Sequence, residues 1–138
     1  MLSPKRQKHR KTFRGTFKRI AVNGSTVAFG SFGLKSLEAG MVTDRQIESC
    51  RVVLARATRK IGKFWIRIFP DKPYTKKPPE VTMGAGKGDV DHFFAKIAPG
   101  RIMFEIEGLN QADAQTVLHS VSSKLPVTTK VISYRHHA

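Results

Sequence analysis

Hydrophobic residues recur at helical spacing between residues 43 and 61. Thr43 and Gln46 form a possible capping box at the start of this stretch, and Gly62 is placed to end it. Residues spaced in this way lie on one side of a helix and can be buried together. We therefore predict a helix over residues 43–61. Its buried stripe is expected to consist of Ile47, Cys50, Val53, Leu54, Ala57 and Ile61.

A second helical pattern lies between Asn110 and Pro126. The side chain of Asn110 can accept a hydrogen bond at the start of a helix, and Asp113 in the first turn is favourable to the helix dipole. Pro126 stops the helix, because proline has no N–H to donate. The expected apolar stripe is Ala114, Val117, Leu118, Val121 and Leu125.

A compact run of aromatic and β-branched residues predicts a strand that ends at Pro70. Successive side chains of a strand point to opposite faces. One face is expected to carry Phe64, Ile66 and Ile68, and the other Trp65, Arg67 and Phe69. Two readings of Trp65 stay open at this stage, a core residue or an exposed ring that stacks on an RNA base.

Four further stretches predict strands. Residues 91–98 and 101–107 flank the tight-turn pair Pro99-Gly100, so they are expected to form a hairpin. Alternation in the second of them places Ile102, Phe104 and Ile106 inward, and Met103, Glu105 and Glu107 outward. The other predicted strands are one or two short segments within residues 26–37, after a turn at Asn23-Gly24 and with a bend at Gly30 and Gly33, and a last strand at residues 127–134.

Together these elements predict an α+β fold in which two helices cover one side of a mostly antiparallel sheet. A length of 138 residues favours a single domain, residues 1–138. Cys50 is the only cysteine, so no disulfide within the chain is possible. No apolar run approaches the roughly 20 residues of a membrane-spanning helix.

The charge of the chain points to a polyanionic partner. Its 25 Lys and Arg against 10 Asp and Glu give a formal net charge of +15. Such a charge disfavours the compact state unless an anion offsets it, and nucleic acid is the first candidate. The helix at 43–61 is expected to present an RNA-facing basic side. That side carries Arg45, Arg51, Arg56, Arg59 and Lys60. Arg67, in the strand that follows the helix, is also predicted to bind rRNA.

Residues 1–19 form a basic arm, and acids are absent before Glu38. Its few large apolar residues, chiefly Phe13 and Phe17, cannot supply a core, so the arm is expected to order only against phosphates. The aromatic rings could stack on unpaired bases. The predicted RNA-binding residues of the arm are Lys5, Arg6, Lys8, Arg10, Lys11, Arg14, Lys18 and Arg19.

Residues 70–90 are expected to form a long, stiff and basic loop. Four prolines, at positions 70, 73, 78 and 79, favour extended backbone, and glycines near its end let backbone approach another molecule closely. A loop of this length in a small domain is usually functional. The residues predicted to act in it are Lys72, Lys76, Lys77, Met83, Gly84, Gly86, Lys87 and Gly88.

Catalytic and metal-binding patterns are weak in this sequence. Gly86-Lys87 is followed by Gly88 rather than Ser or Thr, and position 81 holds no glycine, so a Walker nucleotide loop is excluded. The five histidines show no metal-ligand spacing. Asp89 and Asp91 are expected to be solvated turn residues rather than a general-base pair. The chain is therefore predicted to be no enzyme and to hold no cofactor, metal or small-molecule substrate.

Several motifs occur in order along nearly the whole chain. They are Met1-Leu2-Ser3-Pro4-Lys5-Arg6, Phe29-Gly30-Ser31-Phe32-Gly33-Leu34-Lys35, Arg45-Gln46-Ile47-Glu48, the strand from Arg59 to Pro70, and Met83-Gly84-Ala85-Gly86-Lys87-Gly88 followed by Phe93. In these motifs the chain resembles the bacterial-type large-subunit ribosomal protein sixteen. Phe64, Thr82 and Ala85 depart from the family pattern, and the last two remove positive charge from the loop.

The resemblance implies an α/β-hammerhead fold and a structural role in the large ribosomal subunit. The protein would bind large-subunit rRNA near the aminoacyl-tRNA site and support late assembly and tRNA positioning. Its loop motif, on Met83, Gly84, Gly86, Lys87 and Gly88, would extend towards the peptidyl transferase centre. The family's basic amino-terminal motif falls on Lys5 and Arg6, and its strand motif on Trp65 and Arg67. Implied partners are rRNA, tRNA and neighbouring ribosomal proteins, in bacterial cytoplasm or in an organelle.

Three alternatives remain beside this reading. A free-standing RNA-binding module, such as an RNA chaperone or regulator, would also be strongly basic. A membrane-surface protein would need a basic helix with a bulky apolar face, but the stripe at 43–61 includes Cys50 and Ala57 and lacks an aromatic residue. An enzyme acting on an anionic substrate would need a catalytic grouping that the sequence does not show.

Overall fold

The computed structural model describes residues 1–9, 11, 12, 19–21, 23–76, 84 and 86–134. Within these residues two helices and seven strands are formed. In chain order they are β1 (Phe32–Ser36), β2 (Gly40–Thr43), α1 (Asp44–Thr58), β3 (Lys63–Ile66), β4 (Lys72–Lys76), β5 (Asp89–Ile97), β6 (Ile102–Glu107), α2 (Gln111–Ser122) and β7 (Thr129–Ser133). None of the described helices has the length and apolar character needed to cross a membrane.

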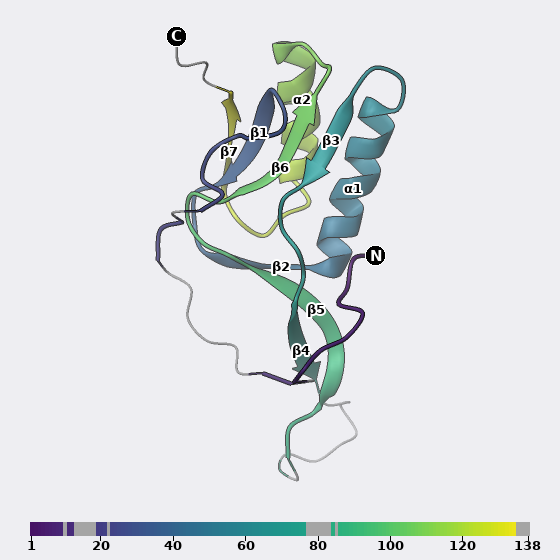
Figure 1. Cartoon of the computed structure of the whole chain (residues 1–138), viewed down its shortest axis with the longest axis vertical. Helices are drawn as coiled ribbons and strands as arrows, with labels where there is room; N and C mark the ends of the chain where they lie inside the picture. The colour runs from purple at the N-terminus through teal and green to yellow at the C-terminus, as the bar shows by residue number, and fades with distance from the viewer. Residues whose placement is uncertain (10, 13–18, 22, 77–83, 85, 135–138) are drawn as a thin grey trace.

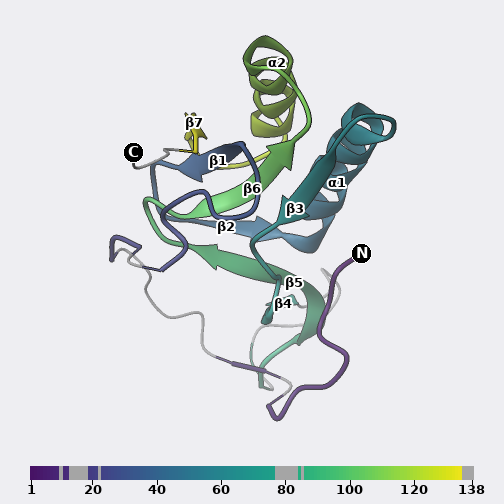
Figure 2. The same ribbon diagram turned by 45° about the horizontal axis from the view of Figure 1, so that its top comes forward.

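The strands form two antiparallel sheets (Figure 1). One has the order β3-β6-β1-β7, and the other has the order β2-β5-β4. Helices α1 and α2 pack against each other and against the four-stranded sheet. Figure 2 shows both helices on the same side of that sheet, while β4 and β5 extend away from it. The predicted α+β fold with two helices on one side is therefore confirmed.

Both helices begin where the sequence predicts. The Thr43 hydroxyl accepts a hydrogen bond from the Gln46 backbone N–H at 3.2 Å, and the Gln46 side chain accepts one from the Thr43 N–H at 2.9 Å. Asn110 likewise caps α2 by accepting from the Asp113 N–H at 2.8 Å. Each cap satisfies N–H groups that have no partner in the first helical turn. The capping predictions are confirmed.

Helix α1 ends at Thr58, three residues before the predicted end, and Ile61 is 67% exposed. Ile61 was therefore wrongly assigned to the buried stripe. The chain makes a tight turn here, in which the Gly62 N–H donates to the Thr58 carbonyl at 3.2 Å. This turn lies against the turn at Gly108, where an added Cβ would sit 2.2 Å from the Ile61 carbonyl oxygen. Close backbone packing of the two turns leaves the Ile61 side chain outside.

The core lies between the helices and the four-stranded sheet. Leu34 and Phe104 from the sheet meet Ile47, Leu54 and other residues of the helix stripes, all essentially without solvent exposure. Cys50 belongs to this cluster, and its thiol lies 3.7 Å from the Val121 carbonyl oxygen. Burial raises the pKa of the Cys50 thiol to about 12. The predicted stripe of α2 is confirmed for Ala114, Leu118 and Val121, which are buried, and for Val117, which is partly buried. The helix ends at Ser122, before the predicted stop at Pro126, so Leu125 packs against the core from beyond the helix.

The predicted hairpin of residues 91–98 and 101–107 is wrong, because β5 and β6 belong to different sheets. The tight turn at Pro99 and Gly100 is present, but its backbone groups bond elsewhere. The Gly100 N–H donates to the Ser36 carbonyl at 2.8 Å, and the Ala21 N–H donates to the Pro99 carbonyl at 2.8 Å. The end of β1 thus takes the pairing positions that a hairpin would need, and the two strands diverge.

The predicted two-sided pattern of β6 is also wrong, because Met103 and Glu105 are both completely buried. Pairing with β1 shifts register at this point, so that Leu34 faces Phe104 while Lys35 faces Ile102. Met103 is the extra residue of this irregularity and joins the helix-covered core. The other face of β6 is covered as well, because the segment at Val27 to Gly30 lies against it.

The predicted loop at 70–90 contains a strand. Residues 72–76 form β4 and pair with β5, so the described base of the loop is a two-stranded ribbon. Pro73 is accommodated because β4 is an edge strand, where a missing N–H need not interrupt a ladder on both sides. We call residues 72–76, 84 and 86–93 the finger. It extends from the body of the molecule in Figure 1.

Candidate nucleic-acid interface

Part of the predicted interface lies outside the described residues. These positions are Arg10, Arg14, Lys18, Lys77 and Met83, together with Phe13, Phe17, Thr82 and Ala85. The remaining predicted residues fall into three places: the outer side of α1, the finger, and the arm, by which we mean the described residues between 1 and 19.

Helix α1 presents a basic outer side. Arg45, Arg56, Arg59 and Lys60 are exposed. Arg51 is partly engaged within the helix, because its guanidinium lies against the Glu48 carboxylate, with Nη2 2.6 Å from Oε1. That hydrogen bond lowers the pKa of Glu48 and raises the pKa of Arg51. Four of the five cations predicted for this helix are therefore exposed, Arg45 and Arg56 on α1 and Arg59 and Lys60 in the turn that follows it, where they can contact phosphates.

The described tip of the finger consists of exposed glycine and lysine. Gly84 and Gly86 have φ values of 102° and 95°, a conformation that side chains rarely adopt. No described atom lies within 4 Å of the point where a Cβ would sit on either residue. The described part of the chain therefore does not fill the space beside this backbone. Lys76 and Lys87 are exposed on the same finger, and Lys72 is half-buried.

The arm runs beside the finger, which the sequence did not indicate (Figure 1). Near its start the Gln7 side-chain amide donates to the Asp71 carbonyl at 3.1 Å. Farther along, Lys11 Nζ donates to the Lys87 carbonyl at 3.2 Å, and Lys87 Nζ donates to the Thr12 carbonyl at 2.7 Å. Two basic segments more than 70 residues apart in sequence thus meet at one end of the molecule. Exposed cations of the arm are Lys5, Arg6, Lys8 and Arg19.

Arg67, which the sequence assigned to the interface, is engaged inside the protein. Its Nη1 lies 3.0 Å from Glu105 Oε2 and donates to the Thr26 carbonyl at 2.7 Å. The side chain is only 15% exposed, and that of Glu105 is 0% exposed. A buried carboxylate requires a paired charge and hydrogen bonds; Arg67 supplies the charge, and backbone N–H groups supply the hydrogen bonds. A direct contact between Arg67 and RNA stays a prediction.

Sequence reasoning missed Glu105 as a structural centre. Its Oε1 accepts hydrogen bonds from three successive backbone N–H groups, those of Ala28, Phe29 and Gly30, at 2.9, 2.9 and 3.0 Å. The available signal was an acid placed among Phe104 and other large apolar residues, with Arg67 on the outward face of a predicted strand. Pairing of β3 with β6 then brings the two together.

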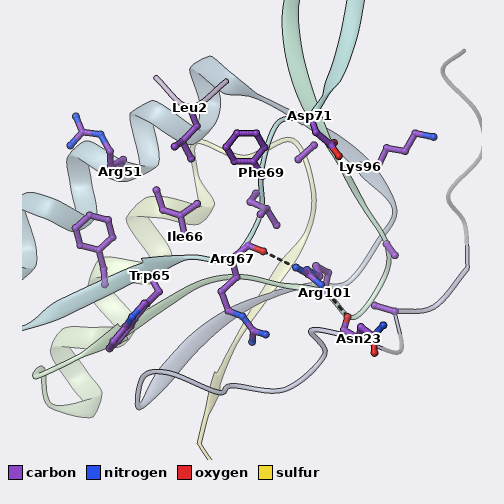
Figure 3. Close-up of a pocket in the computed structure, with 15 residues that line it drawn as sticks. Leu2, Asn23, Arg51, Trp65, Ile66, Arg67, Phe69, Asp71, Lys96 and Arg101 are labelled. Carbon is purple, nitrogen blue, oxygen red and sulfur yellow. Dashed lines mark hydrogen bonds between the residues drawn. The ribbon is translucent and has the colours of Figure 1, made fainter. Parts of the chain in front are cut away.

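Trp65 is half-buried and stacks on Phe29, with ring centroids 6.1 Å apart and an angle of 25° between the planes. The reading of Trp65 as a plain core residue is therefore wrong. Beside it lies an open hollow of about 930 Å³, whose lining includes Arg51, Phe69 and Arg101 (Figure 3). This hollow combines aromatic rings with guanidinium groups.

Arg101 is held at the edge of this hollow by two carbonyls. Its Nη2 donates to the Arg67 carbonyl at 2.7 Å, and its Nη1 donates to the Asn23 carbonyl at 3.2 Å (Figure 3). Burial, and then the charge of Arg67, lower the pKa of the Arg101 guanidinium. Both acceptors are neutral carbonyl oxygens, so these hydrogen bonds leave the positive charge of Arg101 available to an external anion.

Groups of three or more metal-ligating side chains do not occur among the residues that the structure describes. Asp91 pairs with His92, with 2.7 Å between its Oδ2 and the histidine Nδ1, and that hydrogen bond is the main cause of the lowered pKa of Asp91. His92 also stacks on Tyr74 across the finger, with ring centroids 4.7 Å apart. These contacts stabilise the pairing of β4 with β5. Taken together, the fold and its basic surfaces define a cationic protein suited to binding an extended polyanion.

Comparison with known proteins gives the family. Residues 4–132 match the family described as ribosomal protein L16p/L10e. The chain is 52% identical to large ribosomal subunit protein uL16 of Thermosipho melanesiensis, over 99% of this chain and 95% of the relative. It is 52% identical to that of Rickettsia africae, over 96% of this chain and 97% of the relative. The chain belongs to the ribosomal protein L16p/L10e family. The family resemblance in the sequence motifs is thereby confirmed, and with it a structural role in the ribosome rather than an enzymatic one.

Proposed function

We propose that this structural constituent of the large ribosomal subunit binds the subunit's rRNA near the aminoacyl-tRNA site. The finger extends towards the peptidyl transferase centre, and the protein supports late subunit assembly and tRNA positioning. The names of its relatives support a place in the large subunit. That the relatives named here come from bacteria supports a bacterial ribosome, with an organellar ribosome as the alternative.

The observation that carries this proposal is the meeting of the arm and the finger at one end of the fold. Lys11, Thr12 and Lys87 are bonded to one another there through their backbone carbonyls and lysine amines. Next to them the glycine backbone at 84 and 86 is exposed, with open space among the described residues. Phosphates and 2′-hydroxyls of folded RNA are recognised by such cations and backbone groups.

Residues of the finger provide the first test. We expect the double substitution Lys72→Ala with Lys87→Ala to leave the fold intact and to weaken binding of aminoacyl-tRNA to purified subunits. A matched control is Lys124→Ala with Lys130→Ala, which removes two exposed cations near α2 and β7. If the finger variant unfolds early in a thermal melt monitored by circular dichroism, the finger is structural. If it binds tRNA like the control, the proposed site is contradicted.

Sedimentation of tagged protein through a high-salt gradient tests the place of the protein in the subunit. Each phosphate contact adds roughly 0.7–0.9 to the log–log slope of binding against salt, so purely electrostatic association is lost quickly as salt rises. Stoichiometric retention in the large-subunit peak is expected. Release at moderate salt would instead favour a free-standing RNA-binding module.

A further inference from the structure

Phe29 is a large aromatic residue that the fold leaves 58% exposed. Its ring stacks on Trp65, and the Arg67 guanidinium carbon lies 5.3 Å from its centroid. Trp65 and Arg67 are two residues apart in an extended strand and therefore project from the same face. The Phe29 ring therefore contacts both of them while more than half of the residue stays exposed to solvent.

The position of this exposed ring is determined by buried groups. The backbone at Ala28 to Gly30 wraps around the Glu105 carboxylate through three hydrogen bonds. Glu105 is also the cross-strand partner of Trp65. At Gly30 an added Cβ would sit 2.7 Å from the Ile106 carbonyl oxygen, so this backbone lies directly against β6. A carboxylate without solvent exposure is therefore used to hold an aromatic ring that is itself exposed.

Cations outnumber acids around this ring pair. The hollow beside Trp65 is lined by Arg51, Arg67, Lys96 and Arg101 and by the carboxylate of Asp71. Two of these cations are paired within the protein, Arg51 with Glu48 and Arg67 with Glu105. A second, smaller hollow is lined by Arg59 and Lys63, and Glu107 is the cross-strand partner of Lys63. A flat aromatic surface with this surrounding charge suits a nucleobase whose flanking phosphates reach the guanidinium groups.

We propose that the Phe29 ring, supported by Trp65 and Arg67, is a stacking platform for one unpaired base of the ribosomal RNA. This inference rests on the proposed RNA-binding function and adds to it a base contact away from the finger. An apolar segment of a neighbouring protein is the other occupant to be distinguished, but the basic residues around the rings and the net charge of +15 favour a nucleic acid.

Trp65 provides a direct probe, because it is the only tryptophan of the chain. Its fluorescence is measured while the full-length protein is titrated with single-stranded oligoadenylate in about 0.3 M salt, where electrostatic binding is weakened. An abasic ribose-phosphate oligomer of the same length and charge is the control ligand. We expect quenching with oligoadenylate and no quenching with the abasic oligomer.

Substitutions at the platform sharpen this measurement. Phe29→Ala is expected to lower the affinity for oligoadenylate about 5- to 150-fold, the range of one base–aromatic stack, and to leave binding of the abasic oligomer unchanged. Phe29→Tyr keeps the ring and should restore binding. The matched control is Leu37→Ala, which removes another exposed apolar side chain, 52% exposed, and should change nothing.

Each outcome decides between the two proposals. Binding of both oligomers without a change in Trp65 fluorescence would overturn the platform and leave RNA binding intact. Failure to bind either oligomer at low salt would contradict RNA binding itself. In assembled large subunits, a photoreactive benzoylphenylalanine in place of Phe29 should cross-link to rRNA, whereas cross-linking to protein alone would show that the platform holds a neighbouring protein instead.

Discussion

The helix-covered body and the finger of this protein are held together in different ways. In the body, Leu34, Phe104 and Leu118 are among many apolar side chains that lose essentially all solvent contact. In the finger, β4 and β5 are joined by backbone pairing, by the Tyr74 and His92 stack, and by contacts with the arm. Burial thus determines the body, whereas the finger depends on local backbone pairing and on contacts with the arm.

The largest difference is expected when phenylalanine is replaced in each environment. Phe104→Ala removes a fully buried ring and should lower the free energy of unfolding by about 3–5 kcal/mol, because a cavity is left behind. Phe69→Ala, at the junction with the finger, removes a ring that is 46% exposed and should cost less than about 1 kcal/mol. Urea denaturation monitored by circular dichroism measures both, and equal losses would contradict the division.

Two glutamates of β6 test the role of buried charge. Glu105→Gln keeps an acceptor for the backbone N–H groups but leaves Arg67 without its counter-charge, so a loss of about 3 kcal/mol is expected. Glu107→Gln, two residues along the same strand and exposed, should cost less than about 0.5 kcal/mol. The same urea titrations measure the effect. If Glu105→Gln left the free energy of unfolding unchanged, the charge of the carboxylate would be dispensable.

Glycines with positive φ allow a third comparison. Gly108→Ala would place a Cβ 2.2 Å from the Ile61 carbonyl oxygen, and should lower stability by about 2–3 kcal/mol. Gly84→Ala has a similar φ but open space among the described residues, so only the conformational cost of about 1 kcal/mol or less is expected. Thermal melts of the two variants should differ clearly, and similar melting temperatures would count against this account.

The smallest expected effect concerns Cys50. Since burial raises the pKa of its thiol to about 12, above the value of an unfolded chain, the thiol stays neutral in the folded state. Stability present at neutral pH is then lost as pH rises above about 9, by roughly 1.4 kcal/mol at pH 10. Unfolding of the wild type and Cys50→Ala at pH 8 and pH 10 measures this difference. Rapid labelling of the folded protein by iodoacetamide would contradict it.

The sequence was most informative about local structure. Capping residues at Thr43 and Asn110 and the apolar stripes of both helices predicted α1 and α2 almost completely. Long-range pairing was less accessible. The register shift opposite Leu34 turned Met103 inward, and pairing of Ser36 with the Pro99–Arg101 turn separated β5 from β6. Alternation of apolar and polar residues does not reveal where a strand carries an extra, unpaired residue. It also does not reveal which strand will pair with a turn.

The candidate interface was predicted from charge but not from position. Basic residues of α1 are exposed as expected, because few acids lie near them in sequence. The contact of the arm with the finger depends on Lys11, Thr12 and Lys87, whose exposed polar groups leave no hydrophobic pattern to detect. The exposure of Phe29 could not be predicted either, because a large apolar residue is normally expected in the core.

Strand β5 gives the molecule a mechanical property. It runs for nine residues, about 30 Å, from the exposed finger to Ile97, which has no solvent exposure. Phe94 pairs on one side with Lys72 of the finger and on the other with Thr43, the residue that caps α1. A pull or push on the finger therefore loads a row of backbone hydrogen bonds in shear. The force reaches the body first at Thr43, the residue at the amino end of α1.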